Sequence, residues 1–193
     1  MKLVTIQPQL VYDKVMRSGF FTATPKFSSY VGTSRDGYDG FKDAYQWLMR
    51  QMAIKIGSPP SSVRTPIWAW YRHSPITRTG PRPYKPDPTD MKLVLEVPDD
   101  ELVLSNFHKW NRIINGWYIP IGATEDERTK DDDRHHELSE WEQDREIRAS
   151  WQRVFECDTK DNVQATFWTL KKEYIVSANY ARNYMSKGWN WAA

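Results

Sequence analysis

The sequence predicts one α+β domain, a single compact unit in which helices pack against a mixed, mostly antiparallel sheet. Its 193 residues are the size of one domain. Hydrophobic residues make up 39% of the chain and charged residues 27%, which is the balance of a globular protein. Alternating and helical hydrophobic patterns follow one another unevenly along the chain, and this order argues against a regular βαβ array.

The first expected element is a strand over residues 3–7, which Pro8 ends because proline has no amide hydrogen to donate. Helical spacing predicts a helix over residues 9–18, and Gly19 suits the left-handed position that ends a helix. Three glycines within residues 28–40 predict a loop. The chain therefore opens with a strand–helix unit and then a long connection.

The strongest helical pattern covers residues 41–56 and stops at Gly57. Its apolar positions recur at steps of three and four residues, at Phe41, Ala44, Tyr45, Leu48, Met52 and Ile56. Strands are expected over residues 66–71 and 91–97. Five prolines within residues 74–88 argue against regular structure between these two strands.

The second half of the chain predicts helices over residues 105–115 and 138–155 and a strand over residues 163–170. A highly charged run at about residues 122–137 is expected to form a solvated loop or an insertion. Residues 174–184 are expected to form a final helix. These elements complete the predicted α+β domain.

The single cysteine, Cys157, rules out an internal disulfide and suits a reducing compartment. Its neighbours Glu156 and Asp158 are expected to raise the pKa of the thiol, which argues against a nucleophilic role. No apolar run reaches the length of a signal-peptide core or of a membrane span. We therefore expect a cytoplasmic protein that does not contact a membrane.

Charge is unevenly distributed along the chain. Residues 44–86 contain no carboxylate and carry +7, so the remaining residues carry −5 within a net charge of +2. The cations of this basic block are Arg50, Lys55, Arg64, Arg72, Arg78, Arg82 and Lys85. Tryptophan and tyrosine are interleaved with them, a composition that holds phosphates while rings stack on bases. The alternatives are that the block faces solvent, or that the acidic run at residues 125–146 docks against it.

Two segments supply the candidate site residues. In a strand, Trp68, Trp70 and Arg72 share one side, while Tyr71 and His73 lie on the other. His73 is a candidate general base near neutral pH. The expected ligand-binding residues are Trp68, Trp70, Arg72, Arg78, Arg82 and Gln164, and the candidate catalytic residues are Tyr71, His73 and Glu173.

Gln164 shares one face of the strand expected over residues 163–170 with Thr166 and Trp168. Glu173 is the nearby carboxylate that suits an acid or base. We expect no metal site, because the ligand-type residues of the run 131–137 are adjacent and match no metal-binding spacing. No phosphate-binding loop, nucleophile elbow or dinucleotide fingerprint is present in the sequence.

Five phrases of the sequence stand out together. They are Thr5-Ile6-Gln7, Pro66-Ile67-Trp68-Ala69-Trp70-Tyr71, Leu95-Glu96-Val97-Pro98-Asp99-Asp100-Glu101, Leu104-Ser105-Asn106-Phe107 and Gln164-Ala165-Thr166-Phe167-Trp168. Together they resemble an uncharacterised bacterial family that is known only as a domain of unknown function. The resemblance spans nearly the whole chain and implies no reaction.

A strand and a helix that lead to Gly19 and two phenylalanines, with a later proline–aromatic–Arg pattern, are similar to the ADP-ribosyltransferase superfamily, especially its DNA-modifying toxin branch. This resemblance implies NAD as the cofactor. The superfamily uses an Arg or His on its first strand, a Tyr or Ser in mid-chain and a late Glu. Tyr71 and Glu173 match the second and third positions, whereas the first strand offers Thr5 and Gln7.

Three functions follow as hypotheses. The first is a nucleotide-dependent transferase of the ADP-ribosyltransferase kind, acting in bacterial or phage conflict. The second is a nucleic-acid-binding protein without enzymatic activity, whose affinity would fall steeply with salt. The third is a protein-interaction module that uses exposed tryptophans, with Trp68 and Trp110 as the residues to mutate.

Overall fold

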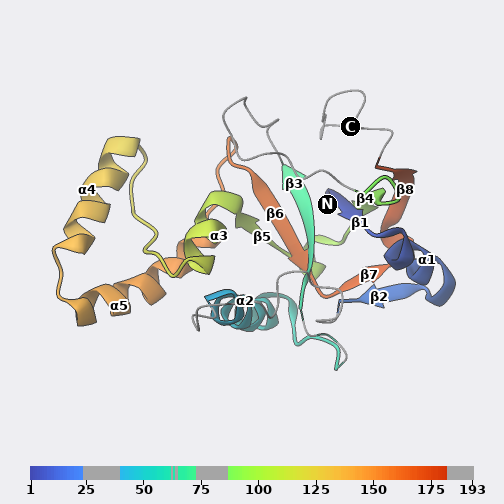
Figure 1. The fold of residues 1–193 in the computed structure, drawn as a ribbon, viewed down its shortest axis with the longest axis horizontal. Helices are drawn as coiled ribbons and strands as arrows, with labels where there is room; N and C mark the ends of the chain where they lie inside the picture. The colour runs from blue at the N-terminus through green and yellow to red at the C-terminus, as the bar shows by residue number, and fades with distance from the viewer. Residues whose placement is uncertain (24–39, 62, 64, 73–86, 182–193) are drawn as a thin grey trace.

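The computed structural model describes residues 1–23, 40–61, 63, 65–72 and 87–181. Its centre is a six-stranded sheet in the order β5-β6-β3-β1-β4-β8, accompanied by a two-stranded sheet of β2 and β7 (Figure 1). The strands are β1 (Lys2–Gln7), β2 (Phe20–Thr22), β3 (Ile67–Arg72), β4 (Met91–Glu96), β5 (Leu102–Asn106), β6 (Val163–Phe167), β7 (Thr169–Lys171) and β8 (Ile175–Tyr180). The helices are α1 (Gln9–Ser18), α2 (Gly40–Ile56), α3 (Phe107–Ile114), α4 (Glu125–His136) and α5 (Glu140–Ser150).

The predicted α+β class is confirmed, and every strand pair in the described part of the chain is antiparallel. The N-terminal unit follows the sequence prediction closely. Helix α1 ends at Gly19, whose φ of 84° is left-handed and whose amide donates to the carbonyl of Val15 at 2.8 Å. The helix α2 likewise ends before Gly57, which also has positive φ.

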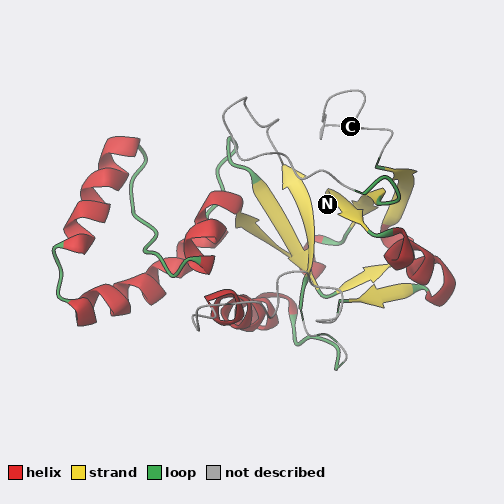
Figure 2. Ribbon diagram, viewed as in Figure 1, coloured by secondary structure: helices red, strands yellow, loops and turns green. Residues whose placement is uncertain are grey.

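The two faces of the large sheet bury two separate apolar clusters. One cluster joins the sheet to α1 and to the small sheet, and its members include Leu3, Val15 and Leu170. The other joins the sheet to α2, α3 and the 3₁₀ helix η3 (Trp151–Phe155), and includes Leu48 and Trp110. The sheet therefore forms the middle layer between two differently built coverings (Figure 2).

Two predictions about the sheet were wrong. Residues 102–106 form the edge strand β5, so α3 begins only at Phe107. Asn106 caps this helix, because its side chain accepts hydrogen bonds from the amides of His108 and Lys109. The helix expected over residues 174–184 is in fact strand β8 over its described part. It pairs with β4 along its length, and this pairing satisfies the backbone in a way that the local hydrophobic pattern does not reveal.

The charged run is helix α4 and not the expected loop. Thr124 and Glu127 form a capping box, in which the Thr124 side chain accepts from the amide of Glu127 and the Glu127 side chain accepts from the amide of Thr124. Three acidic residues occupy its first turn and basic residues its last, as the helix dipole favours. Helices α4 and α5 project from the sheet as an arm, which we define as residues 123–150 (Figure 1).

Candidate functional site

Three neighbouring strands bring several predicted ligand-binding residues together. Trp70 of β3 lies opposite Gln164 of β6, which in turn lies opposite Ser105 of β5. Trp68 stands two residues before Trp70 and therefore faces the same side of the sheet. We call the surface formed by Trp68, Trp70, Ser105 and Gln164 the aromatic face.

Rings from the covering helices pack on the aromatic face. The Trp68 ring lies 5.1 Å from Trp110 of α3 and 6.1 Å from Tyr45 of α2, measured between centroids. The Trp70 ring lies 5.3 Å from Phe107, the first residue of α3. Trp110 is buried in the second apolar cluster, and Trp68 is partly buried against it.

Arg72 departs from the predicted alternation. The register between β3 and β6 shifts between Trp70 and Arg72, so Tyr71 forms a bulge and Arg72 lies level with Val163. The Arg72 guanidinium donates to the backbone oxygens of Asp158 at 2.7 Å and Thr159 at 2.9 Å. Arg72 therefore ties the turn before β6 to the end of β3.

Polar atoms without hydrogen-bond partners are concentrated around this face. Across the described residues, five buried side-chain polar atoms have no partner, and four belong to β3, β5 and β6. These are Trp68 Nε1, Arg72 Nε, Ser105 Oγ and Gln164 Oε1. Such an atom costs about 1–3 kcal/mol of stability unless water or another molecule supplies its partner. Three of the four atoms belong to the aromatic face, and Arg72 lies level with Val163 at the end of β3.

Of the predicted catalytic residues, the structure describes Tyr71 and Glu173, and it places them on different parts of the sheet. Tyr71 is exposed at the end of β3, with the Arg72 guanidinium 5.4 Å from its ring centroid. Glu173 precedes β8 at the edge of the sheet, and β1 and β4 lie between β8 and β3. Three strand spacings of about 4.8 Å, roughly 14 Å in all, separate these two strands. His73, Arg78 and Arg82 lie outside the described residues.

A carboxylate cluster near Glu173 was missed in the sequence. Lys171 Nζ contacts both carboxylate oxygens of Glu101, at 3.0 and 2.9 Å, and the Tyr174 hydroxyl donates to the same carboxylate. The Tyr174 bond holds the pKa of Glu101 below its usual value, while burial raises the pKa of Tyr174 to about 12. The cluster ties β7 to the segment that leads into β5, and Glu173 reaches it only through a 4.0 Å contact with Lys171.

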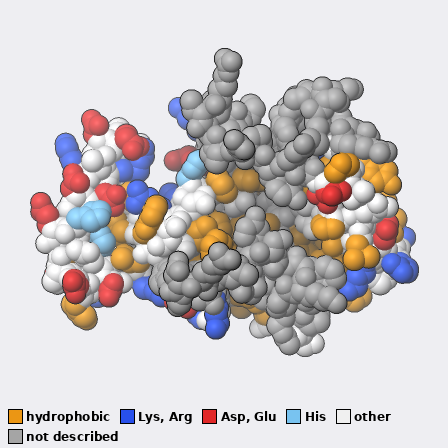
Figure 3. All heavy atoms as spheres, in the orientation of Figure 1, with side chains coloured by type: hydrophobic (Ala, Val, Ile, Leu, Met, Phe, Trp, Pro, Cys, Tyr) orange, Lys and Arg blue, Asp and Glu red, His pale blue; other side chains and the backbone are white. Residues whose placement is uncertain are grey.

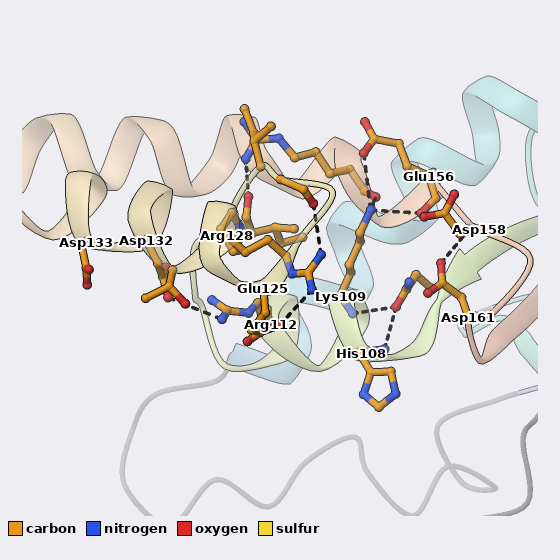
Figure 4. A pocket seen from close by; sticks show the side chains of 17 residues that line it. His108, Lys109, Arg112, Glu125, Arg128, Asp132, Asp133, Glu156, Asp158 and Asp161 are labelled. Atoms are coloured by element: carbon orange, nitrogen blue, oxygen red, sulfur yellow. Dashed lines mark hydrogen bonds and ion pairs between the residues drawn. The ribbon is translucent and has the colours of Figure 1, made fainter.

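A polar cavity of about 710 Å³ lies at the base of the arm, beside the N-terminal end of α3 (Figure 4). Its walls carry four cations, Lys109, Arg112, Arg128 and Arg153. All four donate to backbone carbonyls of this chain. Three of the cations, Arg112, Arg128 and Arg153, donate to carbonyls of the connection before α4, as in the 2.8 Å bond from Arg112 to the oxygen of Tyr118, whereas Lys109 donates to the carbonyls of Arg153 and Glu156. The three arginines therefore help to hold the arm in place, and each cavity cation already has carbonyl partners within this chain.

Gly122 lies in that connection and approaches the start of α4 closely. Its φ is 153°, and a Cβ added there would lie 2.7 Å from the amide nitrogen of Arg128 and 2.7 Å from the Cβ of Glu127. A glycine is required at this position because any side chain would push α4 away from the body.

Cys157 agrees with the expectation of an inert thiol. Burial, together with the nearby carboxylate of Asp161, raises the pKa of this thiol to about 11. The flanking residue Asp158 has only a small effect, so the structural cause differs from the one that the sequence suggested. Across the described residues, no group of three or more potential ligands is arranged to hold a metal ion.

Only three cations of the basic block fall in the described part of the chain. Arg50 and Lys55 are exposed on α2, with Lys55 4.5 Å from the Phe155 ring centroid, and Arg72 is at the end of β3. Where residues are described, no ion pair joins the acidic run to this block. The run instead pairs with its own arginines and with α3, as in the 2.8 Å pair of Glu146 with Arg134.

The comparisons with known proteins agree with the first resemblance found in the sequence. The model of the family described as "Domain of unknown function (DUF3841)" matches residues 2–176. No curated protein and no solved structure is significantly similar to the chain. None of the described helices is both long and apolar enough to span a membrane. Because the match covers nearly the whole chain, this protein belongs to the DUF3841 family.

Proposed function

We propose that the protein binds a nucleotide and holds the base of that nucleotide on the aromatic face. The observation that carries the proposal is the group of four buried polar atoms without partners on β3, β5 and β6. Native proteins leave few such atoms, and binding sites are among the places where they persist. A ligand that supplies the missing partners would recover their desolvation cost on binding.

The chemistry of these atoms suits the edge of a nucleobase. Trp68 Nε1 is a donor, Gln164 Oε1 is an acceptor, and the Ser105 hydroxyl is both. A nucleobase edge presents donors and acceptors side by side and therefore pairs with such a mixed set. Stacking of a base on an aromatic side chain such as Trp70 would add about 1–3 kcal/mol to the free energy of binding.

The phosphate end of the ligand is assigned to Arg72. Its two terminal nitrogens are held by the carbonyls of Asp158 and Thr159, which fixes the plane of the guanidinium. The Nε hydrogen has no partner and is one of the donors available for an anionic oxygen. The bulge at Tyr71 places this arginine at the end of the strand that carries Trp68 and Trp70.

NAD is the first nucleotide to test, because the resemblance to the ADP-ribosyltransferase superfamily implies that cofactor. Glu173 precedes β8 whereas Tyr71 lies on β3, and transfer of ADP-ribose would need both at one site. The structure therefore supports binding of NAD more directly than transfer of ADP-ribose. Loss of nicotinamide from NAD is therefore a second measurement, made on the same samples. Glu173→Gln tests it, and unchanged turnover in this variant would remove Glu173 from the reaction.

Calorimetric titration of the purified protein with NAD, ATP and a short single-stranded oligonucleotide tests the proposal. Trp68→Phe keeps one aromatic ring but removes the Nε1 donor together with the smaller ring of the indole, and Gln164→Leu removes the acceptor. We expect each to weaken nucleotide binding about tenfold, the value of one hydrogen bond. The matched control is Trp141→Phe, which alters an exposed tryptophan of the arm and should leave affinity unchanged.

Absence of binding to all three ligands would refute the proposal, as would full affinity in both Trp68→Phe and Gln164→Leu. The oligonucleotide separates a free nucleotide from a nucleic acid. A nucleic-acid site would prefer the oligonucleotide and lose affinity steeply between two salt concentrations, because phosphate binding releases counterions.

A further inference from the structure

The arm differs in charge from the rest of the molecule. Residues 123–150 contain 11 acidic and 5 basic residues, a net charge of −6, so the other residues carry +8 within the total of +2. Acidic side chains are spread over the arm end in the space-filling view (Figure 3). One end of this molecule is thus strongly negative while the remainder is positive.

The arm buries almost no apolar side chain. The buried residue of α4 is His135, and that of α5 is Ser150. His135 stacks on Tyr118 with centroids 4.1 Å apart, and Arg134 bridges Asp131 and Glu146. Helices that are polar on all sides contribute little to a core and are instead solvated and held by side-chain pairs, so most of their surface is open to contact from outside.

The exposed tryptophans of the described chain are found on the arm or at its base. Trp141, near the start of α5, is 69% exposed, with the guanidinium of Arg145 4.9 Å from its ring centroid. Trp117 is 58% exposed but precedes the arm and belongs to neither α4 nor α5, so Trp141 is the exposed tryptophan of the arm surface. A tryptophan this exposed is costly in water, and tryptophan is enriched among residues that dominate protein interfaces.

A basic and apolar surface lies at the opposite end of the molecule, on α1 and β2 (Figure 1). Leu10 is 60% exposed and Phe20 is 53% exposed. Lys14 and Arg17 follow Leu10 by four and seven residues, so all three share the side of α1 that faces away from the core. Asp13 also lies on this side, so α1 contributes a net charge of +1 there. We call this surface, formed by Leu10, Lys14, Arg17 and Phe20, the α1 face.

We propose that the arm of one copy of this protein docks on the α1 face of a second copy. The two surfaces are complementary in charge, and each adds exposed apolar side chains to its charges. They lie at opposite ends of the longest axis, so they meet between molecules and not within one (Figure 1). Such a head-to-tail contact joins two different surfaces and allows further copies to add.

A charge swap tests the proposal by sedimentation velocity of the full chain. The wild type should associate with rising concentration at low salt, and less so at high salt. Reversing the arm (Glu140→Lys with Asp144→Lys) should abolish association, and so should reversing the α1 face (Lys14→Glu with Arg17→Glu). An equimolar mixture of the two variants should associate again, because each reversed surface then meets its complement.

Trp141→Ser should weaken association about thirtyfold, as truncation of a dominant interface residue does. The matched control is Trp117→Ser, which removes an exposed tryptophan outside α4 and α5 and should leave association unchanged. A wild type that stays monomeric at low salt would overturn the proposal. Normal association of the α1 variant, or a mixture that stays monomeric, would also overturn it. Recovery in the mixture shows that both variants are folded.

Discussion

The body and the arm of this molecule are stabilised by different forces. The sheet of the body buries two apolar clusters, one against α1 and the small sheet and the other against α2 and α3. The arm is held to the body by arginines, carboxylates and backbone carbonyls. Hydrophobic periodicity therefore accounts for the body, whereas helix capping and charge account for the arm.

The largest expected effect is a core truncation in the body. Phe167 is one of the largest fully buried side chains, and it pairs with Ile67 on one side and Leu102 on the other. Phe167→Ala should lower the free energy of unfolding by about 3–5 kcal/mol. Chemical denaturation monitored by tryptophan fluorescence measures this value. A loss below about 1 kcal/mol would show that the body does not depend on this cluster.

The next effect is expected where the arm joins the body. The Ser150 hydroxyl accepts from the buried amide of Ile119 at 2.9 Å and donates to the carbonyl of Ile147 at 2.7 Å. Ser150→Ala leaves that amide unsatisfied and should cost about 1–3 kcal/mol in the same denaturation experiment. An unchanged midpoint would mean that the amide finds another partner.

Gly122→Ala should loosen the arm while leaving the body folded. The new Cβ has no room beside the backbone of α4, and the backbone conformation is one that side chains rarely adopt, which costs about 1–3 kcal/mol. Hydrogen exchange should become faster in α4 and stay unchanged in β1 and β4. Equal acceleration in both regions would contradict the separation between arm and body.

Acid should also act on the arm before the body. Hydrogen bonds from Arg134 lower the pKa of Glu146, and the bond from Ser139 lowers that of Glu142. Carboxyls with lowered pKa values stabilise the fold above their usual pKa, and this stability is lost as the pH falls through the lowered values. Helix content by circular dichroism should therefore begin to fall below about pH 4, before tryptophan fluorescence changes. Simultaneous transitions would contradict this order.

Sequence reasoning was most successful where one force dominates. Helices α1 and α2 and strand β3 were predicted nearly to their ends, because apolar spacing and terminal glycines agree there. The fold of α4 was missed because charge density was taken as a sign of a loop, although Thr124 and Glu127 form a recognisable capping box. The strand β8 was missed because its partner, β4, is distant in sequence.

The site was predictable in part for the same reason. Alternation in β3 and β6 was enough to place Trp68, Trp70 and Gln164 on shared faces, but only the register shows that these faces coincide. Ser105 was missed because it was assigned to the start of a helix, and the position of Arg72 depends on a bulge that no pattern signals. Pairing between distant strands is the information that a single sequence lacks.

The smallest expected effect compares two buried serines. Ser105 is fully buried like Ser150, but its hydroxyl has no partner within the described residues. Ser105→Ala should therefore leave the free energy of unfolding unchanged or raise it by up to about 1 kcal/mol, since a cost of desolvation is removed and no bond is lost. The same variant should bind nucleotide less tightly than the wild type. A destabilisation as large as that of Ser150→Ala would mean that the hydroxyl is already satisfied in the free protein, and the aromatic face would lose one of the atoms that mark it as a site.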